Sequence, residues 1–291
     1  MAVGTLSGSF VAVYEGPWDL SGFSDDRGDG SPGSLLVWGA PASRDFYVEV
    51  SGYGEGSYSL RVGVSDIVDD YANGVEGAAR VVLEEAGEGV LDYDGDVDYF
   101  VFEAVEGELY EIDVALGTLY DSEVAVYDED GVHLGWNDDR GDESYASLIV
   151  WRAPESGDFF VEVSGYGEGS YTVAVGVSDI VDDHPDLAED AAAVEVGKRV
   201  GGVLDYADDV DVFVLAAVEG ELYEIDVVLG TLNDSVVTIY DADGFELAWN
   251  DDHEGSLASR VEWRAPLTGD FYVEVSGFGE GSYTLAVEVS E

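Results

Sequence analysis

Residues 158–171 read "DFFVEVSGYGEGSY", and close copies of this stretch occur at 45–58 and 270–283. In each copy, apolar and polar residues alternate ahead of a glycine-rich segment. Strict alternation is typical of a β-strand with one buried face, and the glycines indicate that a turn follows it. Recurrence of so long a stretch predicts that the chain is built from internal β-rich repeats.

Other motifs recur with one spacing. "GTL" begins at Gly4, Gly117 and Gly230, which are 113 residues apart each time. Units of that length are whole domains rather than turns of a solenoid. The last repeat is one residue short, between Asp252 and Trp263, and the first has no counterpart of about 71–113. The predicted domains are an incomplete first repeat at 1–65, a second repeat at 66–178 and a third repeat at 179–291.

Within a repeat the hydrophobic period is two. "YEIDVAL" at 110–116 places Tyr110, Ile112 and Val114 on one face and charged residues on the other. Similar runs predict eight or nine short strands per repeat. The fold class is therefore all-β, with tandem antiparallel β-sandwich domains of the jelly-roll type. "GYGEGSY" resembles a phosphate loop, but no helix follows it, so a hairpin turn is expected instead.

The charge is strongly unbalanced, with 65 acidic residues, 10 Lys and Arg, and a formal net charge of −55. Such a surface repels nucleic acid and anionic membranes, which both carry phosphate. It also destabilises the compact state by self-repulsion, which salt screens. The composition therefore predicts a halophilic or cation-rich setting and excludes nucleic acid as a partner.

Little in the sequence points to an enzyme or a membrane protein. The chain has no Cys, and residues 1–10 lack the basic start and apolar segment of a signal peptide. No apolar run is long enough to predict a transmembrane helix. The histidines, His133, His184 and His253, do not occupy equivalent positions in two repeats. A non-enzymatic protein without membrane insertion is expected.

Three blocks of the third repeat carry a family resemblance. They are "DDHPDLAEDAAAVEVGKRVGGVLDYADDVDVFVLAAVEGELYEIDV" (182–227), "YDADGFELAWNDD" (240–252) and "APLTGDFYVEVSGFGEGSYTLAV" (265–287). They resemble the bacterial pre-peptidase C-terminal domain, which is similar to the collagen-binding domains of clostridial collagenases. The resemblance implies a jelly-roll-like β-sandwich that is secreted, often appended to extracellular peptidases, not itself catalytic, and able to bind calcium.

Calcium takes six to eight oxygen ligands, and two acidic clusters per repeat can supply them. The repeats are joined by short acidic segments at 65–70 and 178–183, here called the lead-in segments. The first cluster combines a lead-in segment with a later acidic loop, an arrangement that the resemblance to the collagen-binding domains implies. The alternative is that these are polar turn residues. The candidates in this cluster are Asp69, Asp70, Asp96 and Asp98, then Asp182, Asp183, Asp209 and Asp211. The second cluster is Asn137, Asp138 and Asp139 with Asp121, matched by Asn250, Asp251 and Asp252 with Asp234.

A cell-adhesion tripeptide, Arg140-Gly141-Asp142, follows the second cluster and is matched at 27–29. The third repeat has His253-Glu254-Gly255 at this place. The tripeptide is therefore interpreted as part of a solvated loop.

Two functions remain open from the sequence. The first is a non-enzymatic extracellular structural protein, a calcium-stabilised acidic array in a surface layer, matrix or filament. The alternative is an accessory substrate-binding or stabilising tail of a secreted halophilic peptidase. The incomplete first repeat further predicts self-association, because half a sandwich leaves its core face uncovered.

Overall fold

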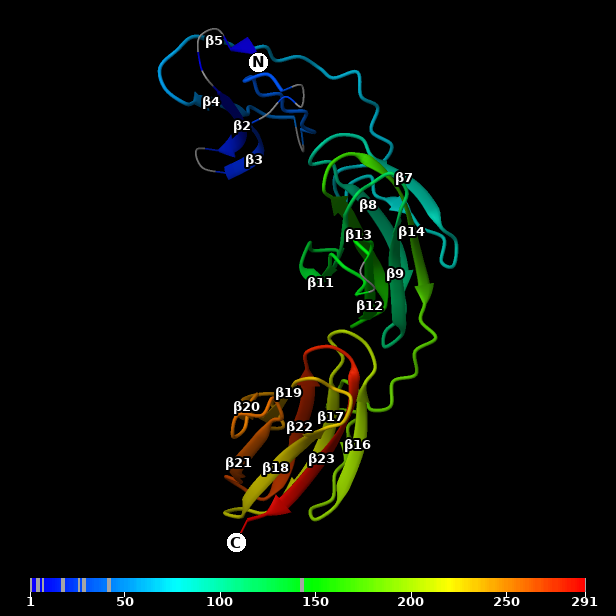
Figure 1. The fold of residues 1–291 in the computed structure, drawn as a ribbon. Helices are drawn as coiled ribbons and strands as arrows, with labels where there is room; N and C mark the ends of the chain where they lie inside the picture. The colour runs from blue at the N-terminus through cyan, green and yellow to red at the C-terminus, as the bar shows by residue number, and fades with distance from the viewer. Residues whose placement is uncertain are drawn as a thin grey trace. The chain divides into compact units, whose positions relative to one another are not determined.

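A computed structural model describes residues 2–3, 6, 8–16, 19–25, 27, 30–40, 43–141 and 144–290. The chain divides into two compact units, Met1–Ser178 and Asp179–Glu291. Every regular element among the described residues is a β-strand, which confirms the all-β fold class (Figure 1). The described residues contain no helix of the length and apolar character needed to cross a membrane.

The second repeat folds as two stacked sheets. One has five strands in the order β11-β10-β13-β8-β6, and the other has four in the order β12-β9-β14-β7. Alternating residues of both sheets face each other and form one core. The strands are β6 (Ala79–Arg80), β7 (Gly87–Leu91), β8 (Asp98–Ala104), β9 (Leu109–Leu116), β10 (Ser122–Tyr127), β11 (His133–Asn137), β12 (Ser147–Arg152), β13 (Gly157–Gly165) and β14 (Gly169–Val177).

The third repeat has the same architecture. Its sheets run β15-β17-β22-β19-β20 and β16-β23-β18-β21, around a separate core. The nine strands in each of these two repeats agree with the number expected from the alternation. They are β15 (Ala192–Ala193), β16 (Arg199–Leu204), β17 (Asp211–Ala217), β18 (Leu222–Leu229), β19 (Ser235–Tyr240), β20 (Glu246–Asn250), β21 (Arg260–Arg264), β22 (Gly269–Gly277) and β23 (Gly281–Val289).

Two details differ from the sequence-based expectation. The two-residue strands β6 and β15 pair in parallel with β8 and β17, so the sheets are not purely antiparallel. The "GYGEGSY" stretch is not a hairpin turn, because β13 and β14 belong to different sheets. It is a connection that crosses from one sheet to the other, as most connections of a jelly roll do.

The glycines of this crossing serve close packing against the "GTL" loop. Thr118 and Ser170 exchange hydrogen bonds, with Ser170 N donating to Thr118 Oγ1 at 2.9 Å. A Cβ on Gly165 would lie 2.2 Å from the carbonyl oxygen of Asp121, and one on Gly169 would lie 2.3 Å from the amide nitrogen of Leu119. The two stretches that reveal the repeat in the sequence therefore recur together because they touch.

Each core is organised around an aromatic pair. Trp151 on β12 packs edge-on against Phe159 on β13, with ring centroids 4.7 Å apart, and Trp263 and Phe271 repeat this contact at 4.7 Å. A buried pair of hydroxyls, Ser122 and Ser147, joins the two sheets at 2.9 Å. Trp151 and Trp263, which occupy equivalent positions, are thus core residues.

The first repeat has only part of this architecture. Its strands β2 (Ser9–Gly16), β3 (Asp19–Ser24) and β4 (Tyr47–Gly52) form a sheet in the order β3-β2-β4. Val11 lies opposite Val50, in the register in which Val124 lies opposite Val163. The short strands β1 (Ala2–Val3) and β5 (Tyr58–Ser59) pair as the ends of β9 and β14 do.

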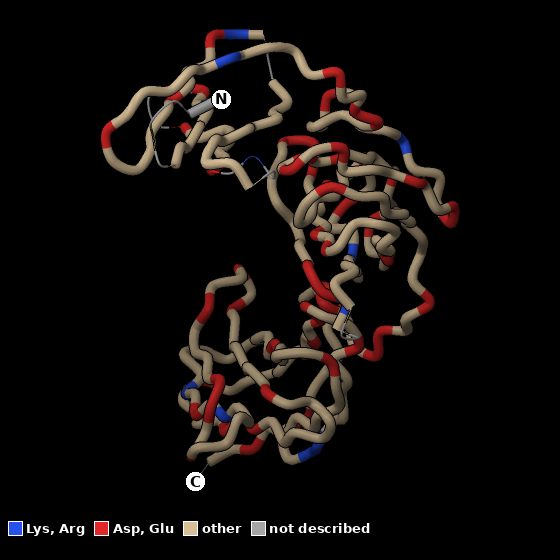
Figure 2. Tube along the Cα trace, turned by 45° about the horizontal axis from the view of Figure 1, so that its top comes forward, with Lys and Arg blue, Asp and Glu red and all other residues tan. Residues whose placement is uncertain are grey.

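Acidic residues are spread along the whole trace, and basic residues are few (Figure 2). Some of these acidic side chains are nevertheless buried, and they gather in two places.

Candidate metal centre

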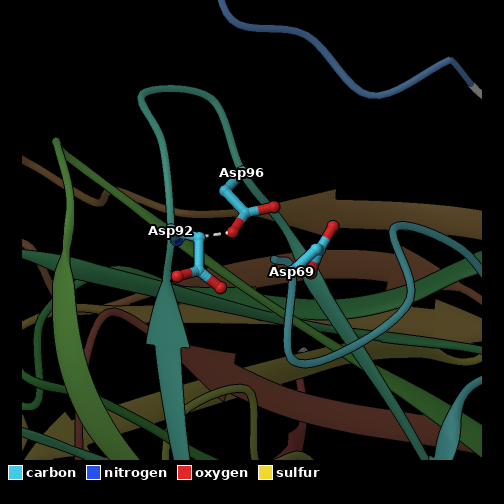
Figure 3. A group of neighbouring side chains, drawn as sticks. All are labelled: Asp69, Asp92 and Asp96. Carbon is cyan, nitrogen blue, oxygen red and sulfur yellow. Dashed lines mark hydrogen bonds between the residues drawn. The ribbon is translucent and has the colours of Figure 1, made fainter. Parts of the chain in front are cut away.

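Five aspartates of the second repeat meet at one end of the sandwich. Asp69 and Asp70 belong to the lead-in segment, Asp92 follows β7 directly, and Asp96 and Asp98 end the loop that leads into β8. Carboxylate oxygens of Asp69, Asp92 and Asp96 lie within 4.8 Å of one another (Figure 3). Those of Asp69, Asp70 and Asp98 form a second such group, which shares Asp69.

Hydrogen bonds hold the lead-in segment against this loop. The amide of Asp70 donates to Asp92 Oδ2 at 3.2 Å, and the amide of Val90 donates to Asp70 Oδ2 at 3.2 Å. The amide of Asp92 donates to Asp96 Oδ2 at 2.6 Å, which closes the loop. The bond between Asp92 and Asp96 is a local turn bond, whereas the other two join segments that are distant in the sequence. Together they place the carboxylates face to face although like charges repel.

Asp98 is the most deeply buried member of the cluster, with no exposed surface. Its Oδ2 accepts a 2.5 Å hydrogen bond from the hydroxyl of Tyr171, and its Oδ1 is buried without a hydrogen-bond partner. Burial, and then the charges of Asp70, Asp96 and Asp69, raise the pKa of Asp98 to about 8. A buried carboxylate without compensating charge is costly, so this site favours a proton or a cation.

The third repeat builds the same cluster from equivalent residues. One group consists of Asp182, Asp183 and Asp205, and the other of Asp182, Asp186 and Asp209. Asp211 accepts a hydrogen bond from Tyr283 at 2.5 Å, as Asp98 does from Tyr171. Its Oδ1 and that of Asp209 are buried without a hydrogen-bond partner. Burial, chiefly, raises the pKa of Asp209 to about 7 and that of Asp211 to about 8.

One position differs between the two clusters. Asn73 in the second repeat donates from Nδ2 to Asp69 Oδ2 at 2.6 Å. The equivalent residue in the third repeat is Asp186, a carboxylate close to Asp182 and Asp209. The third cluster therefore carries one more negative charge than the second.

All sequence-based candidates of the lead-in cluster except Asp211 fall in these groups of close carboxylates, and the charges of Asp209, Asp183 and Asp182 act on Asp211. The predicted set is not complete. Asp92 and Asp205 also belong to the clusters, and the sequence contains a signal for them. "LDYDGDVD" at 91–98 and "LDYADDVD" at 204–211 share the Asp that precedes Tyr, whereas Asp94 is replaced by Ala207. The aspartates of the cluster therefore recur between the repeats, whereas Asp94, which is not in the cluster, does not.

The donor set fits a hard divalent cation. Calcium prefers carboxylate and carbonyl oxygens at flexible geometry, and the cluster offers carboxylate oxygens from two segments of the chain. A second, independent indication of a cation site is that Asp98, Asp209 and Asp211 each have a buried oxygen without a hydrogen-bond partner. Such atoms are rare in folded proteins. Both clusters would hold an ion through the lead-in aspartates, the loop aspartates and the first residue of β8 or β17.

The second candidate cluster is arranged differently. Asn137 Oδ1 accepts from the amide of Leu148 at 3.4 Å, and Asn250 Oδ1 accepts from the amide of Arg260 at 3.3 Å. These asparagines therefore support the neighbouring strand. The adjacent aspartates are exposed, and among the described residues they join no group of three close carboxylates. They are Asp138, Asp139, Asp251 and Asp252.

The charges of this second cluster affect the pKa of Asp121. The pKa of Asp121 is raised by its burial, and then by the neighbouring Asp139 and Asp138. Arg140, which follows them, forms an ion pair with Asp113 of β9. Gly28, Asp29 and Asp142, the remaining parts of the adhesion-like tripeptides, lie outside the described residues. The Arg140 side chain is thus engaged within its own repeat.

The three histidines lie in separate surroundings. His133 packs on Tyr127 with ring centroids 5.3 Å apart, and His184 packs on Phe213 at 4.6 Å. His253 exchanges backbone hydrogen bonds with Ser256 in a turn. None of them belongs to the groups of close metal-binding side chains in the described chain.

No protein-family model matches this chain, and no curated protein matches it. Among solved structures it is similar to the pre-peptidase C-terminal domain of a collagenase from Bacillus anthracis. The identity is 21%, the match covers 36% of this chain and 99% of that domain, and the TM-score is 0.30. It also matches a single-substitution variant of the oxalate decarboxylase of B. subtilis at 14% identity. That match covers 79% of this chain and 80% of the other, with a TM-score of 0.15.

Proposed function

We propose that this chain is a non-enzymatic array of β-sandwich repeats that bind calcium where the lead-in segment meets the sandwich. The observation that carries the proposal is a cluster of aspartates that is built twice, each time with buried members whose carboxylate oxygens lack a hydrogen-bond partner. Aspartates that are present only because the whole chain is acidic would be expected to lie exposed on the surface. They would not be expected to form the same cluster in two repeats. A divalent cation offsets both the repulsion between the carboxylates and the cost of burying them.

The array would work outside the cell, as a component of a surface layer, matrix or filament. Extracellular calcium is plentiful enough to fill sites of modest affinity, such as those of extracellular modules. An acidic surface with so few basic residues suits a medium rich in salt or cations. In this setting a bound cation would tie each lead-in segment to the sandwich that follows and stiffen the junction.

A second candidate function is an accessory tail of a secreted halophilic peptidase. It is favoured by the sequence blocks that resemble the pre-peptidase C-terminal domain, since such domains are appended to peptidases. An array in a matrix would be expected to assemble by itself, whereas a tail would bind the substrate of its peptidase. Electron microscopy of the chain in saline calcium separates the two, because dispersed particles would contradict assembly.

The cation proposal is tested by calorimetric titration of the demetallated chain with calcium in molar salt. We expect at least one ion to bind per complete repeat. Asp69→Asn with Asp182→Asn removes the residue shared by both groups of each cluster and should abolish binding. The matched control, Asp138→Asn with Asp251→Asn, changes two exposed aspartates by the same chemistry and should bind like the parent. Equal loss in both variants would refute specific sites.

The prediction of self-association concerns the first repeat, in which apolar residues such as Val48 and Val62 are exposed. A head-to-tail contact between copies would give a filament, and a contact with a suitable rotation would close into a ring. Sedimentation of the chain over a range of concentrations checks it.

A further inference from the structure

The acidic cluster of the second repeat contains an amide where the cluster of the third repeat has a carboxylate. Asn73 lies in the irregular stretch between Asp70 and β6, and its counterpart is Asp186. Asn73 precedes a glycine, whereas the other asparagines, Asn137, Asn233 and Asn250, each precede an aspartate. An asparagine followed by glycine loses its amide nitrogen most readily, because glycine is flexible and puts no side chain in the way of its own backbone nitrogen.

The backbone nitrogen of Gly74 is accessible in this structure. Neither Asn73 nor Gly74 belongs to a strand, and Asn73 is exposed to solvent. A Cβ built on Gly74 would meet no atom within 4 Å apart from its chain neighbours. The Gly74 amide donates no hydrogen bond within the described part of the chain. Because this amide is not committed to a ladder, it can turn towards the side chain before it.

Two hydrogen-bond donors hold the side-chain carbonyl of Asn73. The hydroxyl of Tyr93 donates to Asn73 Oδ1 at 3.2 Å, and the amide of Val97 donates to the same oxygen at 3.3 Å. Attack on Cγ would move negative charge onto this oxygen. Donors aimed at an oxygen that gains charge stabilise the transition state. The two donors therefore favour attack at this carbonyl.

The third repeat shows that a carboxylate fits at this position. There the hydroxyl of Tyr206 donates to Asp186 Oδ2 at 2.6 Å, as that of Tyr93 donates to Asn73. The carboxylate of Asp186 also belongs to a group whose oxygens lie within 4.8 Å of one another. Conversion of the amide to a carboxylate would thus give the second cluster an arrangement that the third already has.

We propose that Asn73 is a site of spontaneous deamidation, which gives the second cluster the charge of the third. The amide nitrogen of Gly74 attacks Cγ of Asn73, and the bond from Cγ to Nδ2 breaks. Nδ2 leaves as ammonia with the proton that the Gly74 amide gives up, and a succinimide ring remains. Water then adds to either carbonyl carbon of the ring and opens it. The product is an ordinary aspartyl or an isoaspartyl linkage at position 73.

The consequence for cation binding rests on the proposed function. A site with one more carboxylate binds calcium more tightly, because affinity follows the number of ligand charges. The second cluster of a newly made chain would therefore be the weaker of the two. Deamidation to the aspartyl form would remove this difference with time, whereas the isoaspartyl form lengthens the backbone and displaces the segment from the cluster.

The test incubates the intact folded chain in molar salt without calcium at mildly alkaline pH, and follows deamidation by mass spectrometry of tryptic peptides. Residues 62–80 contain Asn73 as their only asparagine, and residues 81–140 contain only Asn137. We expect aspartate and isoaspartate to accumulate in 62–80 while 81–140 stays unchanged. The rate should lie within about tenfold of that of the free peptide 62–80. A folded chain that keeps Asn73 intact while the free peptide deamidates would overturn the proposal.

Two variants test the route of the reaction. Gly74→Ala places a methyl group beside the attacking nitrogen, in open space, and should slow deamidation without disturbing the fold. Tyr93→Phe removes one donor from Asn73 Oδ1 and should slow deamidation of the folded chain by up to about tenfold, the worth of one hydrogen bond. Faster deamidation in Tyr93→Phe would show that the bond only restrains the amide, and would overturn the role of the donors.

Calcium titration of fresh and aged chains separates this proposal from the proposed function. In a chain whose third cluster carries Asp182→Asn, ageing to the aspartyl form should tighten binding about tenfold, as Asn73→Asp should. Deamidation without calcium binding in either chain would refute the proposed function and support the modification. Calcium binding in a chain that does not deamidate would refute the modification alone.

Discussion

The hydroxyl of Tyr171 on β14 donates a 2.5 Å hydrogen bond to Asp98, which begins β8 in the opposite sheet. Tyr283 and Asp211 make the same bond in the third repeat. Each bond joins the two sheets at an acidic cluster. It satisfies one oxygen of the carboxylate and leaves the other buried without a hydrogen-bond partner. A cation bound at the cluster, as proposed above, would compete there with a proton.

Stability without cations should fall as the pH rises. The folded-state pKa of Asp98 and that of Asp211 are raised from 3.8 to about 8, mainly by burial. A raised carboxyl pKa contributes stability that is full below the ordinary pKa and is lost as the pH rises through the folded value. We expect the melting temperature of the demetallated chain in molar salt to drop between pH 5 and pH 9. Asp98→Asn with Asp211→Asn should flatten this drop; a rise with pH would contradict it.

Calcium should raise the melting temperature, and chelation should reverse this. A ligand at about 100 times its dissociation constant stabilises a domain by about 2.7 kcal/mol, which corresponds to a shift of roughly 10 °C for a domain of this size. Calorimetric melting with calcium and with chelator measures it. Asp69→Asn with Asp182→Asn should remove the shift. No shift in the parent chain would exclude structural cation sites.

Exchanging one residue should exchange the affinities of the two clusters. Asn73→Asp gives the second repeat the carboxylate that Asp186 gives the third. We expect it to tighten calcium binding there by about tenfold, and Asp186→Asn to weaken binding in the third repeat by a similar factor, because affinity follows the number of ligand charges. Titration of chains with only one intact cluster resolves each site. Without calcium, Asn73→Asp should lower stability, because Asp69 loses a hydrogen-bond donor and gains a like charge.

The glycine-rich crossing should not tolerate an added methyl group. Gly165→Ala places a Cβ 2.2 Å from a backbone oxygen of the "GTL" loop, which neither segment can avoid without shifting. We expect a loss of about 1–3 kcal/mol, as for overpacking in a core. Gly157→Ala on the same strand is the control, since nothing lies within 4 Å of its Cβ. Urea unfolding of both variants compares them, and equal stability would contradict the packing argument.

Low salt should destabilise the folded chain. The net charge of −55 is screened over about 3 Å at 1 M salt and about 30 Å at 0.01 M. We expect the melting temperature to rise steadily with sodium chloride, and sucrose of the same osmolarity to reproduce only part of the rise. A flat response to salt would argue against a halophilic setting.

Much of the fold follows from local pattern in the sequence. Tyr110, Ile112 and Val114 alternate with charged residues, and all three are buried on one face of β9. The pairing of elements that are distant in the sequence is harder to predict from it. Gly165 and Gly169 look like turn residues in the sequence, and only the proximity of the "GTL" loop explains why they are small.

The candidate site shows the same division. The repeat and the family resemblance predict Asp69 and Asp98 as neighbours, and they do lie together. Asp92 is not predicted, because closely spaced aspartates are frequent in so acidic a chain. Only the recurrence of Asp92 as Asp205 in the third repeat distinguishes it. Burial of Asp98 depends on the fold around it, and no pattern in the sequence reports that one of its oxygens lacks a partner.

The hydrogen bonds between the lead-in segment and the loop after β7 bear on how the chain responds to tension. Asp70 and Asp92 hold the residues through which the chain enters the second repeat. A force applied along the chain would load this contact before it reached the ladders of the sandwich. If a cation binds there as proposed, it would raise the force needed to pull the lead-in segment away from the sandwich.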